Sequence, residues 1–199
     1  MITRILPPEA VHQGDLILVN AHHPCHPLPQ PDLVTVAGTG VQLERRAAQA
    51  LDSLMAAIDG WKGIVPVSGW RALAEQQAIW DGSLAENGLP FTQTYVACPG
   101  CSEHQTGLAI DLGLNQGEID FIRPAFPYEG LCQTFRQTMA QYGWVQRYPA
   151  GKEAITGIGH EPWHFRYVGQ PHAALMAERD LTLEEYIAWI RAFPYESRR

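Results

Sequence analysis

The chain has 199 residues, of which 46% are hydrophobic, and its 14 Lys and Arg against 21 Asp and Glu give a formal net charge of -7. This length suits one sizeable core and is short for two, so we predict a single domain over residues 1–199. An acidic chain rarely presents the clustered positive surface that nucleic acid requires, and no segment reaches the roughly 18 to 20 apolar residues of a membrane span. Nucleic-acid binding and membrane-spanning proteins are therefore excluded classes.

The N-terminal residues do not resemble a secretory signal, because Pro7, Pro8 and Glu9 interrupt the apolar run that such a signal needs. With Met1 as the native start, this predicts a cytoplasmic protein. The cysteine content agrees with a reducing compartment and free thiols, although an even number leaves disulfides open. The four cysteines are Cys25, Cys98, Cys101 and Cys132.

In the N-terminal half, aliphatic residues predict a strand over Asp15–Asn20. Apolar residues recur at three- and four-residue intervals over Val41–Ile58, which indicates an amphipathic helix that ends before Gly60. A strand over Ile64–Val67 then runs into Ser68-Gly-Trp-Arg71, and a second helix follows as far as Asn87 and Gly88.

Three further strands are predicted in the second half of the chain. In Leu108–Leu114 the leucines and Ile110 share one parity, which leaves Asp111 on the less apolar face. A strand begins at Gly143. The segment Trp163–Val168 alternates again, with its aromatic residues on one side and His164 on the other.

Two helices complete the pattern. Leu131–Tyr142 has apolar residues spaced by four, and Thr182–Glu185 is a capping box that begins a C-terminal helix. Helices and strands are mixed without regular βαβ alternation. We therefore predict an α+β fold in which helices pack on a mostly antiparallel sheet beside a zinc cleft.

The residues that carry chemistry belong to these strands and their flanking loops. The strands Leu108–Leu114 and Trp163–Val168 would be neighbours with their polar faces turned the same way. In that case Asp111 and His164 converge with His104, which lies a short turn before the first of these two strands. Such a three-ligand set leaves the fourth zinc position to water, as a catalytic zinc site requires. Glu161 lies close enough in sequence to take a proton from that water, and Arg71 suits a developing oxyanion.

Two separated motifs give these residues a family context. Ser102–Asp111 matches the pattern SxHxxGxAxD, Glu161–His164 matches ExWH, and Ser68-Gly-Trp-Arg71 followed by Gln76 is similar to SGYR…Q with Trp in place of the usual Tyr. The chain thereby resembles the zinc D-Ala-D-Ala carboxypeptidases and dipeptidases of vancomycin resistance, the VanY/VanX-like family, and within it the bifunctional VanXY type. The resemblance spans roughly residues 64 to 190.

The resemblance implies a metallopeptidase of peptidoglycan metabolism that removes the terminal D-Ala from D-Ala-D-Ala, from muramyl pentapeptide precursors, or from both. A loop over Asn115–Gly130 would lie beside the cleft and sort these substrates. The implied roles are zinc binding by His104, Asp111 and His164, base catalysis by Glu161, stabilisation of the oxyanion by Arg71, and substrate binding by Ser102 and Gln76.

Two other patterns could bind metal or perform redox chemistry. Cys98-Pro-Gly-Cys101 is a CxxC motif, but it runs into a His-containing turn rather than opening a helix after a strand, so we interpret it as two buried thiols. His22-His-Pro-Cys25-His26 lies in a predicted loop, and its prolines favour a surface turn at the cleft rim.

Two other functions stay open at this point. A non-catalytic zinc module that binds cell-wall peptide would need neither Glu161 nor Arg71, and both are present. An endopeptidase that cuts cross-linked peptidoglycan would act outside the cytoplasm, against the localisation predicted above.

Overall fold

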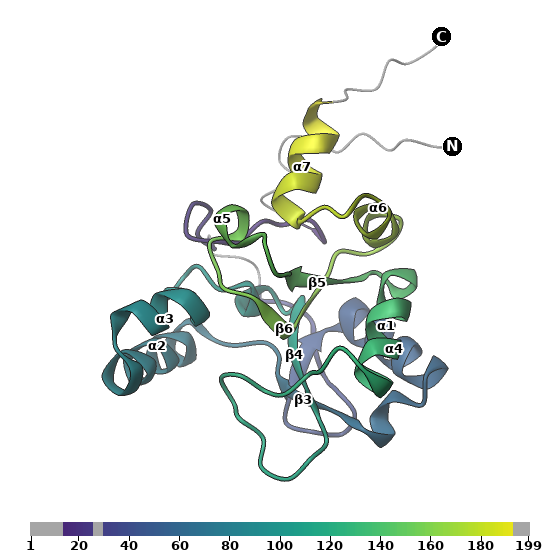
Figure 1. The fold of residues 1–199 in the computed structure, drawn as a ribbon, viewed down its shortest axis with the longest axis horizontal. Coiled ribbons are helices and arrows are strands. Elements are labelled where there is room, and N and C mark those ends of the chain that lie inside the picture. The colour runs from purple at the N-terminus through teal and green to yellow at the C-terminus, as the bar shows by residue number, and fades with distance from the viewer. Residues whose placement is uncertain (1–13, 26–29, 193–199) are drawn as a thin grey trace.

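The computed structural model describes residues 14–25 and 30–192. Its centre is a four-stranded antiparallel sheet with the strand order β3-β4-β6-β5, beside a separate two-stranded sheet of β1 and β2 (Figure 1). The strands are β1 Leu33–Thr35, β2 Gln42–Glu44, β3 Ile64–Ser68, β4 Ala109–Leu114, β5 Trp144–Tyr148 and β6 Glu161–Tyr167. The α-helices are α1 Arg45–Ala57, α2 Leu73–Asn87, α3 Leu89–Tyr95, α4 Gly130–Met139, α5 Glu153–Thr156, α6 His172–Arg179 and α7 Leu183–Ala192. The 3-10 helices within the described residues are η2 Gly60–Lys62, η3 Glu103–Thr106 and η4 Ala140–Tyr142.

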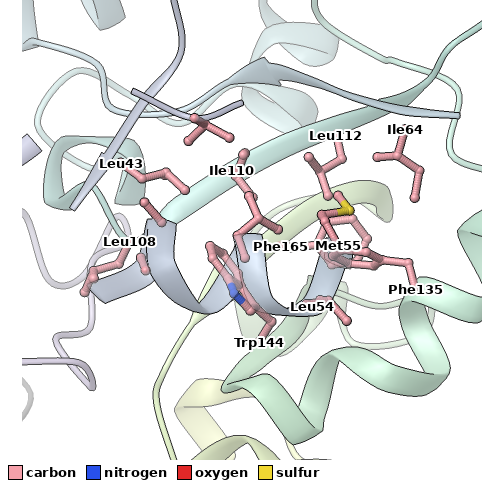
Figure 2. Close-up of a cluster of buried hydrophobic side chains, with 14 of the residues drawn as sticks. Leu43, Leu54, Met55, Ile64, Leu108, Ile110, Leu112, Phe135, Trp144 and Phe165 are labelled. Atoms are coloured by element: carbon pink, nitrogen blue, oxygen red, sulfur yellow. The ribbon is translucent and has the colours of Figure 1, made fainter. Parts of the chain in front are cut away.

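One face of the central sheet packs on α1 and α4. Ile110 of β4 pairs with Phe165 of β6, and both side chains are fully buried against residues such as Leu54 and Phe135 of the two helices (Figure 2). Burying apolar side chains on one face only requires the strict alternation that the sequence shows in both strands. This cluster is the larger of two buried apolar clusters in the described residues.

The second cluster lies beyond β5. It joins Leu16 and Leu18 of the N-terminal segment to α6 and α7, which lie on the β5 side of the sheet (Figure 1). The predicted capping box begins α7, since the Thr182 amide donates to Glu185 at 2.8 Å and the Glu185 amide donates to the Thr182 hydroxyl at 3.3 Å. Tyr186 of α7 packs in this cluster.

The predicted strand at Asp15–Asn20 is wrong. Its aliphatic side chains are buried, but its backbone forms only a bridge from Asn20 to His23 and no ladder with the central sheet. The carbonyls of Asp15 and Ile17 instead accept hydrogen bonds from the Arg166 guanidinium at 3.0 and 2.8 Å. A buried side chain here satisfies the backbone groups that a neighbouring strand would otherwise pair.

The helix predicted from Val41 begins only at Arg45. Gln42–Glu44 pair with β1 instead, and the Glu44 carboxylate caps α1 by accepting from the amides of Arg46 and Ala47. The sequence patterns did not indicate α3, α5 or α6. These helices have 7, 4 and 8 residues, which is too short for a clear periodicity.

The predicted α+β class with an antiparallel sheet is confirmed. The single domain over residues 1–199 stays a prediction, because both ends lie outside the described residues, as do Pro7, Pro8 and Glu9. Within the described part of the chain, no helix is long and apolar enough to cross a membrane.

Candidate active site

Two of the predicted metal ligands are direct cross-strand partners. Asp111 of β4 lies opposite His164 of β6, on the face of the sheet that turns away from α1 and α4. His104 reaches the same place from η3, because Gly107 turns the chain into β4 with a φ of 72°. A side chain at Gly107 would also put its Cβ 3.0 Å from the Glu44 amide nitrogen, so glycine is required here for two reasons.

The donor atoms of these three side chains converge. One atom each from His104, Asp111 and His164 lies within 4.8 Å of the other two, and the three residues are 3–4% exposed. His104 Nδ1 donates to the carbonyl of Gly69 at 2.6 Å, which leaves its Nε2 near Asp111 Oδ2 at 3.2 Å. His164 places Nδ1 2.9 Å from Asp111 Oδ1. The group can hold a metal ion through two imidazole nitrogens and one carboxylate.

Charge is unevenly distributed in this cluster. Burial and the charge of Arg71 lower the pKa of His104 to about 4. Burial also disfavours charge on His164, but the hydrogen bond with Asp111 and the nearby carboxylate of Glu103 outweigh burial and raise the pKa of His164 to about 9. Burial raises the pKa of Asp111, yet the two histidines more than offset this and hold that pKa well below its usual range. The metal-free site therefore keeps its proton on His164, where a metal ion would displace it.

Arg71 is held by four contacts at the edge of the cluster. Its Nε donates to the Ser68 hydroxyl at 2.8 Å, and its Nη1 donates to Gln76 Oε1 at 3.1 Å. Its Nη2 donates to Asp111 Oδ2 at 2.7 Å and also lies 3.0 Å from His104 Nε2. Gln76 is anchored in turn by a 2.8 Å bond from its Nε2 to the Ala97 carbonyl, so it helps to hold the guanidinium in place.

Glu161 begins β6 opposite Tyr148 and is 5% exposed. Its Oε2 lies 3.7 Å from His164 Nδ1. Burial raises the pKa of Glu161 to about 8, with the His164 charge opposing the shift. A carboxyl group whose pKa is near neutrality, beside a metal-binding cluster, is suited to accept and return a proton.

Pro162 lies within β6 and does not end the strand, although the pairing of β6 with β5 shifts register between Gln146 and Tyr148.

All seven predicted site residues line one cavity. Phe121 and Ile122 line it too, which places the predicted Asn115–Gly130 loop beside the cleft. The seven residues are Arg71, Gln76, Ser102, His104, Asp111, Glu161 and His164.

The family model described as VanY, D-alanyl-D-alanine carboxypeptidase, matches residues 40–170, more than half of the chain. The chain belongs to this family.

Individual relatives agree with the family assignment. The bifunctional D-Ala-D-Ala dipeptidase and D-Ala-D-Ala carboxypeptidase VanXYC of Enterococcus gallinarum is 44% identical over 175 residues, which cover 86% of this chain and 92% of the relative. The solved D,D-dipeptidase VanXYg, in complex with a D-Ala-D-Ala phosphinate analog, is 48% identical with a TM-score of 0.90, covering 98% of this chain and 81% of that one.

A solved variant of the D,D-pentapeptidase VanY from a VanB-type resistance cassette is in complex with Zn(II). It is 31% identical with a TM-score of 0.73, covering 87% of this chain and 98% of that one. The predicted resemblance to the VanY/VanX-like family and to the VanXY type is confirmed by these comparisons. The two other functions considered from the sequence, an endopeptidase and a non-catalytic zinc module, are not favoured by them.

Glu103 and Tyr148 are among the residues of the cavity wall that had no role from sequence reasoning. Glu103 lies inside a matched motif but at one of its variable positions, and Tyr148 has no motif at all. The ring of Tyr148 lies 4.8 Å from that of His164. A charged residue at a variable motif position gives no signal of its own, because its partners come from other parts of the chain.

The cysteine and histidine patterns form no second metal group among the described residues. Cys98 and Cys101 enclose a turn in which the Cys101 amide donates to the Cys98 carbonyl at 2.8 Å, and both thiols are free and half-buried rather than buried. His22 is exposed, and His23 closes a turn with Asn20. His26 of this pattern lies outside the described residues, as does the aromatic residue Phe193 near the C-terminus.

Proposed function

We propose that this protein is a zinc-dependent D,D-carboxypeptidase and D,D-dipeptidase. It hydrolyses the terminal D-Ala-D-Ala bond of the free dipeptide, of muramyl pentapeptide precursors, or of both. The observation that carries this proposal is the convergence of three metal donors, one buried carboxyl group and one fixed guanidinium in a single cavity. The D-Ala-D-Ala specificity of VanXYC and VanXYg supports the substrate class.

The metal would be held by His104 Nε2, the Asp111 carboxylate and His164 Nδ1. These residues fit a catalytic zinc ion, since three buried nitrogen and oxygen donors leave a coordination position for substrate or water. Zinc in such a site supplies Lewis-acid chemistry, which polarises a carbonyl group and makes water a nucleophile near neutral pH. The Zn(II) complex of the related VanY enzyme supports the choice of metal.

Glu161 would act as the base. Its ionised carboxylate accepts a proton as water oxygen attacks the scissile carbonyl carbon, and it returns that proton to the nitrogen of the leaving D-Ala as the C–N bond breaks. A pKa of about 8 in the metal-free site favours protonation. A bound cation would lower this pKa toward the range in which the group can both take up and release a proton.

Arg71 would stabilise the negative charge that develops on the carbonyl oxygen. Its contacts with Ser68, Gln76 and Asp111 hold it in place before substrate arrives, so little reorganisation is needed at the moment of reaction. Gln76 contributes through Arg71, and the buried Ser102 lines the cavity where the C-terminal carboxylate of the substrate would bind. The choice between dipeptide and pentapeptide by the Asn115–Gly130 loop, and the cytoplasmic localisation, stay predictions.

The test measures D-Ala release from D-Ala-D-Ala and from UDP-linked muramyl pentapeptide, in parallel, with and without a zinc chelator. We expect release from at least one substrate, loss of release in the chelator, and recovery on adding zinc. No release from either substrate by zinc-loaded protein would overturn the proposed activity. Release that persists after the metal has been removed would overturn the zinc assignment alone.

A further inference from the structure

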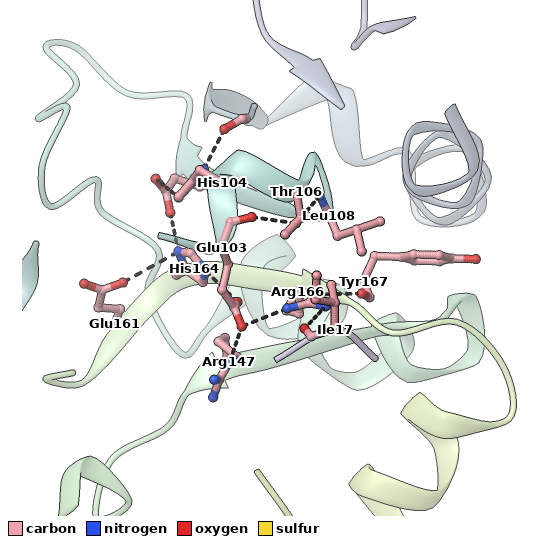
Figure 3. A network of polar contacts seen from close by, with 12 residues as sticks. Ile17, Glu103, His104, Thr106, Leu108, Arg147, Glu161, His164, Arg166 and Tyr167 are labelled. Carbon is pink, nitrogen blue, oxygen red and sulfur yellow. Dashed lines mark hydrogen bonds and ion pairs between the residues drawn. The ribbon is translucent and has the colours of Figure 1, made fainter. Parts of the chain in front are cut away.

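A buried carboxylate stands directly behind the metal-binding histidine. Glu103 is 1% exposed, and its Oε1 accepts from Arg147 Nε and from Arg166 Nη1, both at 2.8 Å (Figure 3). Both guanidinium groups are fully buried. A charged group so deep in the protein is costly unless it is paired. Here the one carboxylate is paired with two guanidinium groups.

The other oxygen of this carboxylate faces His164. Glu103 Oε2 lies 3.7 Å from His164 Nε2, and these are two of the few buried polar atoms in the described residues without a hydrogen-bond partner. His164 turns its opposite nitrogen, Nδ1, to Asp111 at 2.9 Å. When Nδ1 is the metal donor, Nε2 carries the hydrogen and points at a carboxylate oxygen that has no other partner.

The surroundings keep this carboxylate charged and in place. The two guanidinium groups carry the charge opposite to that of the carboxylate, and each lies 2.8 Å from its Oε1. Arg147 is also clamped by both oxygens of Glu184 on α7, at 2.8 and 2.6 Å. Arg166 is fixed from behind by two backbone carbonyls of the N-terminal segment.

We propose that Glu103 is a positioning residue of the metal centre, which accepts the Nε2 hydrogen of His164 and so fixes the ring with Nδ1 as the metal donor. The inference rests on the proposed metal site and adds a layer of residues behind the ligand His164, namely Glu103 and the two arginines that bind it. Carboxylates behind metal-binding histidines commonly set the tautomer and raise the basicity of the ligand, and their loss typically lowers metal affinity by about 10- to 100-fold. In this chain the layer also connects the site to α7 and the N-terminal segment.

A purely structural ion-pair cluster is the alternative to be separated. Glu103→Gln removes the charge and presents an amide to His164, while Glu103→Asp keeps the charge beside the arginines but is one methylene too short to reach the ring. Glu184→Gln is the matched control, because it removes a carboxylate from Arg147 without touching His164. If the cluster is purely structural, all three variants should change zinc affinity to the same extent. If Glu103 positions His164, only the two variants at position 103 should bind zinc more weakly.

The measurement is zinc affinity of the full chain, by competition with a chromophoric chelator. We expect about 10- to 100-fold weaker binding in both Glu103 variants and a change of less than about threefold in Glu184→Gln. In the zinc-loaded wild type, we also expect an NMR signal from a slowly exchanging imidazole hydrogen, absent from His164→Ala and weakened in Glu103→Asp. If Glu103→Gln does not fold, Glu103→Asp decides.

Unchanged zinc affinity in a folded Glu103 variant would overturn the inference, as would an equal loss in Glu184→Gln. Because zinc affinity and the imidazole signal need no substrate, a protein that binds zinc but releases no D-Ala would disprove the proposed activity and leave this result standing.

Discussion

Strands β4 and β6 have two chemically opposite faces built from adjacent residues. Ile110 and Phe165 meet on one face and enter the apolar core, while Asp111 and His164 meet on the other and form the centre of the site. One strand register therefore places both the core residues and the candidate metal donors. A slip of one residue would exchange the two faces, so the apolar packing that stabilises the sheet also sets the geometry of the site.

The two faces are stabilised in different ways. The apolar face gains free energy from burial and tolerates no gaps, since its residues are fully buried. The polar face contains buried charges, which are costly unless each one is paired, and Arg71, Glu103 and Arg166 are paired there by several short contacts each. Substitutions on the first face should change stability, and substitutions on the second should change metal binding and catalysis.

The largest expected effect is that of Glu161→Gln, a substitution on the polar face that should lower activity without lowering stability. The amide keeps the size of the side chain but cannot accept the proton, so kcat/KM for D-Ala-D-Ala should fall by about 10²- to 10⁴-fold. Zinc content and the unfolding midpoint should change little. Steady-state kinetics with metal analysis check this, and an active Glu161→Gln enzyme would exclude the residue as base.

Phe165→Ala is the matching change on the apolar face, next to His164. Truncation of this fully buried ring should lower the free energy of unfolding by about 3–5 kcal/mol, while folded molecules still bind one zinc ion. Ile110→Val in the same row is the control and should cost about 0.5–1.5 kcal/mol. Urea unfolding followed by fluorescence measures both. Equal losses in the two variants would mean that the face is not packed as described.

Metal removal should affect the polar face alone. With free zinc at about 100 times its dissociation constant, binding adds about 2.7 kcal/mol to the unfolding free energy, and a chelator should remove this gain. His164→Ala should show no such zinc-dependent gain, because one donor is missing. Thermal unfolding with and without zinc tests the comparison, and a full gain in His164→Ala would exclude the residue as a ligand.

The smallest effect in any one measurement is a pH dependence of the metal-free protein, which is read as the change in unfolding free energy between buffers one pH unit apart. Burial raises the pKa of Glu161 to about 8 from 4.5, so its contribution to stability is fully present below about pH 4.5 and is lost as the pH rises to about 8. Relative to chelator-treated Glu161→Gln, the wild type should lose on the order of 1 kcal/mol per pH unit in this window. A difference that stays constant with pH would show that the carboxyl group is not perturbed.

Local sequence patterns predicted elements that are long or strictly alternating. The parity of Leu108–Leu114 put Asp111 opposite the core face, and the capping box located the start of α7, because both patterns depend only on neighbouring residues. The aliphatic run Asp15–Asn20 was mistaken for a strand. A run of apolar residues shows that a segment is buried, but not whether another strand pairs with it.

The candidate site divides in the same way. Strand parity alone made Asp111 and His164 plausible as a pair, whereas the selection of His104, Glu161 and Arg71 depended on the family motifs. All of them line one cavity. Motifs preserve spacing within a segment, so they identify residues, but the distances between segments follow from sheet pairing and turns.

The sequence by itself determined the family, the class of fold and the candidate site residues, because motifs and alternation depend on the spacing of residues within one segment. Only the tertiary structure decided how those residues are held. Arg147 is 44 positions from Glu103 in the sequence, and Arg166 is 63 positions from it. Both guanidinium groups nevertheless form buried ion pairs with the Glu103 carboxylate behind His164. The physical reason is that buried charges need partners of opposite sign wherever the fold brings them, and no local pattern records which partners those are.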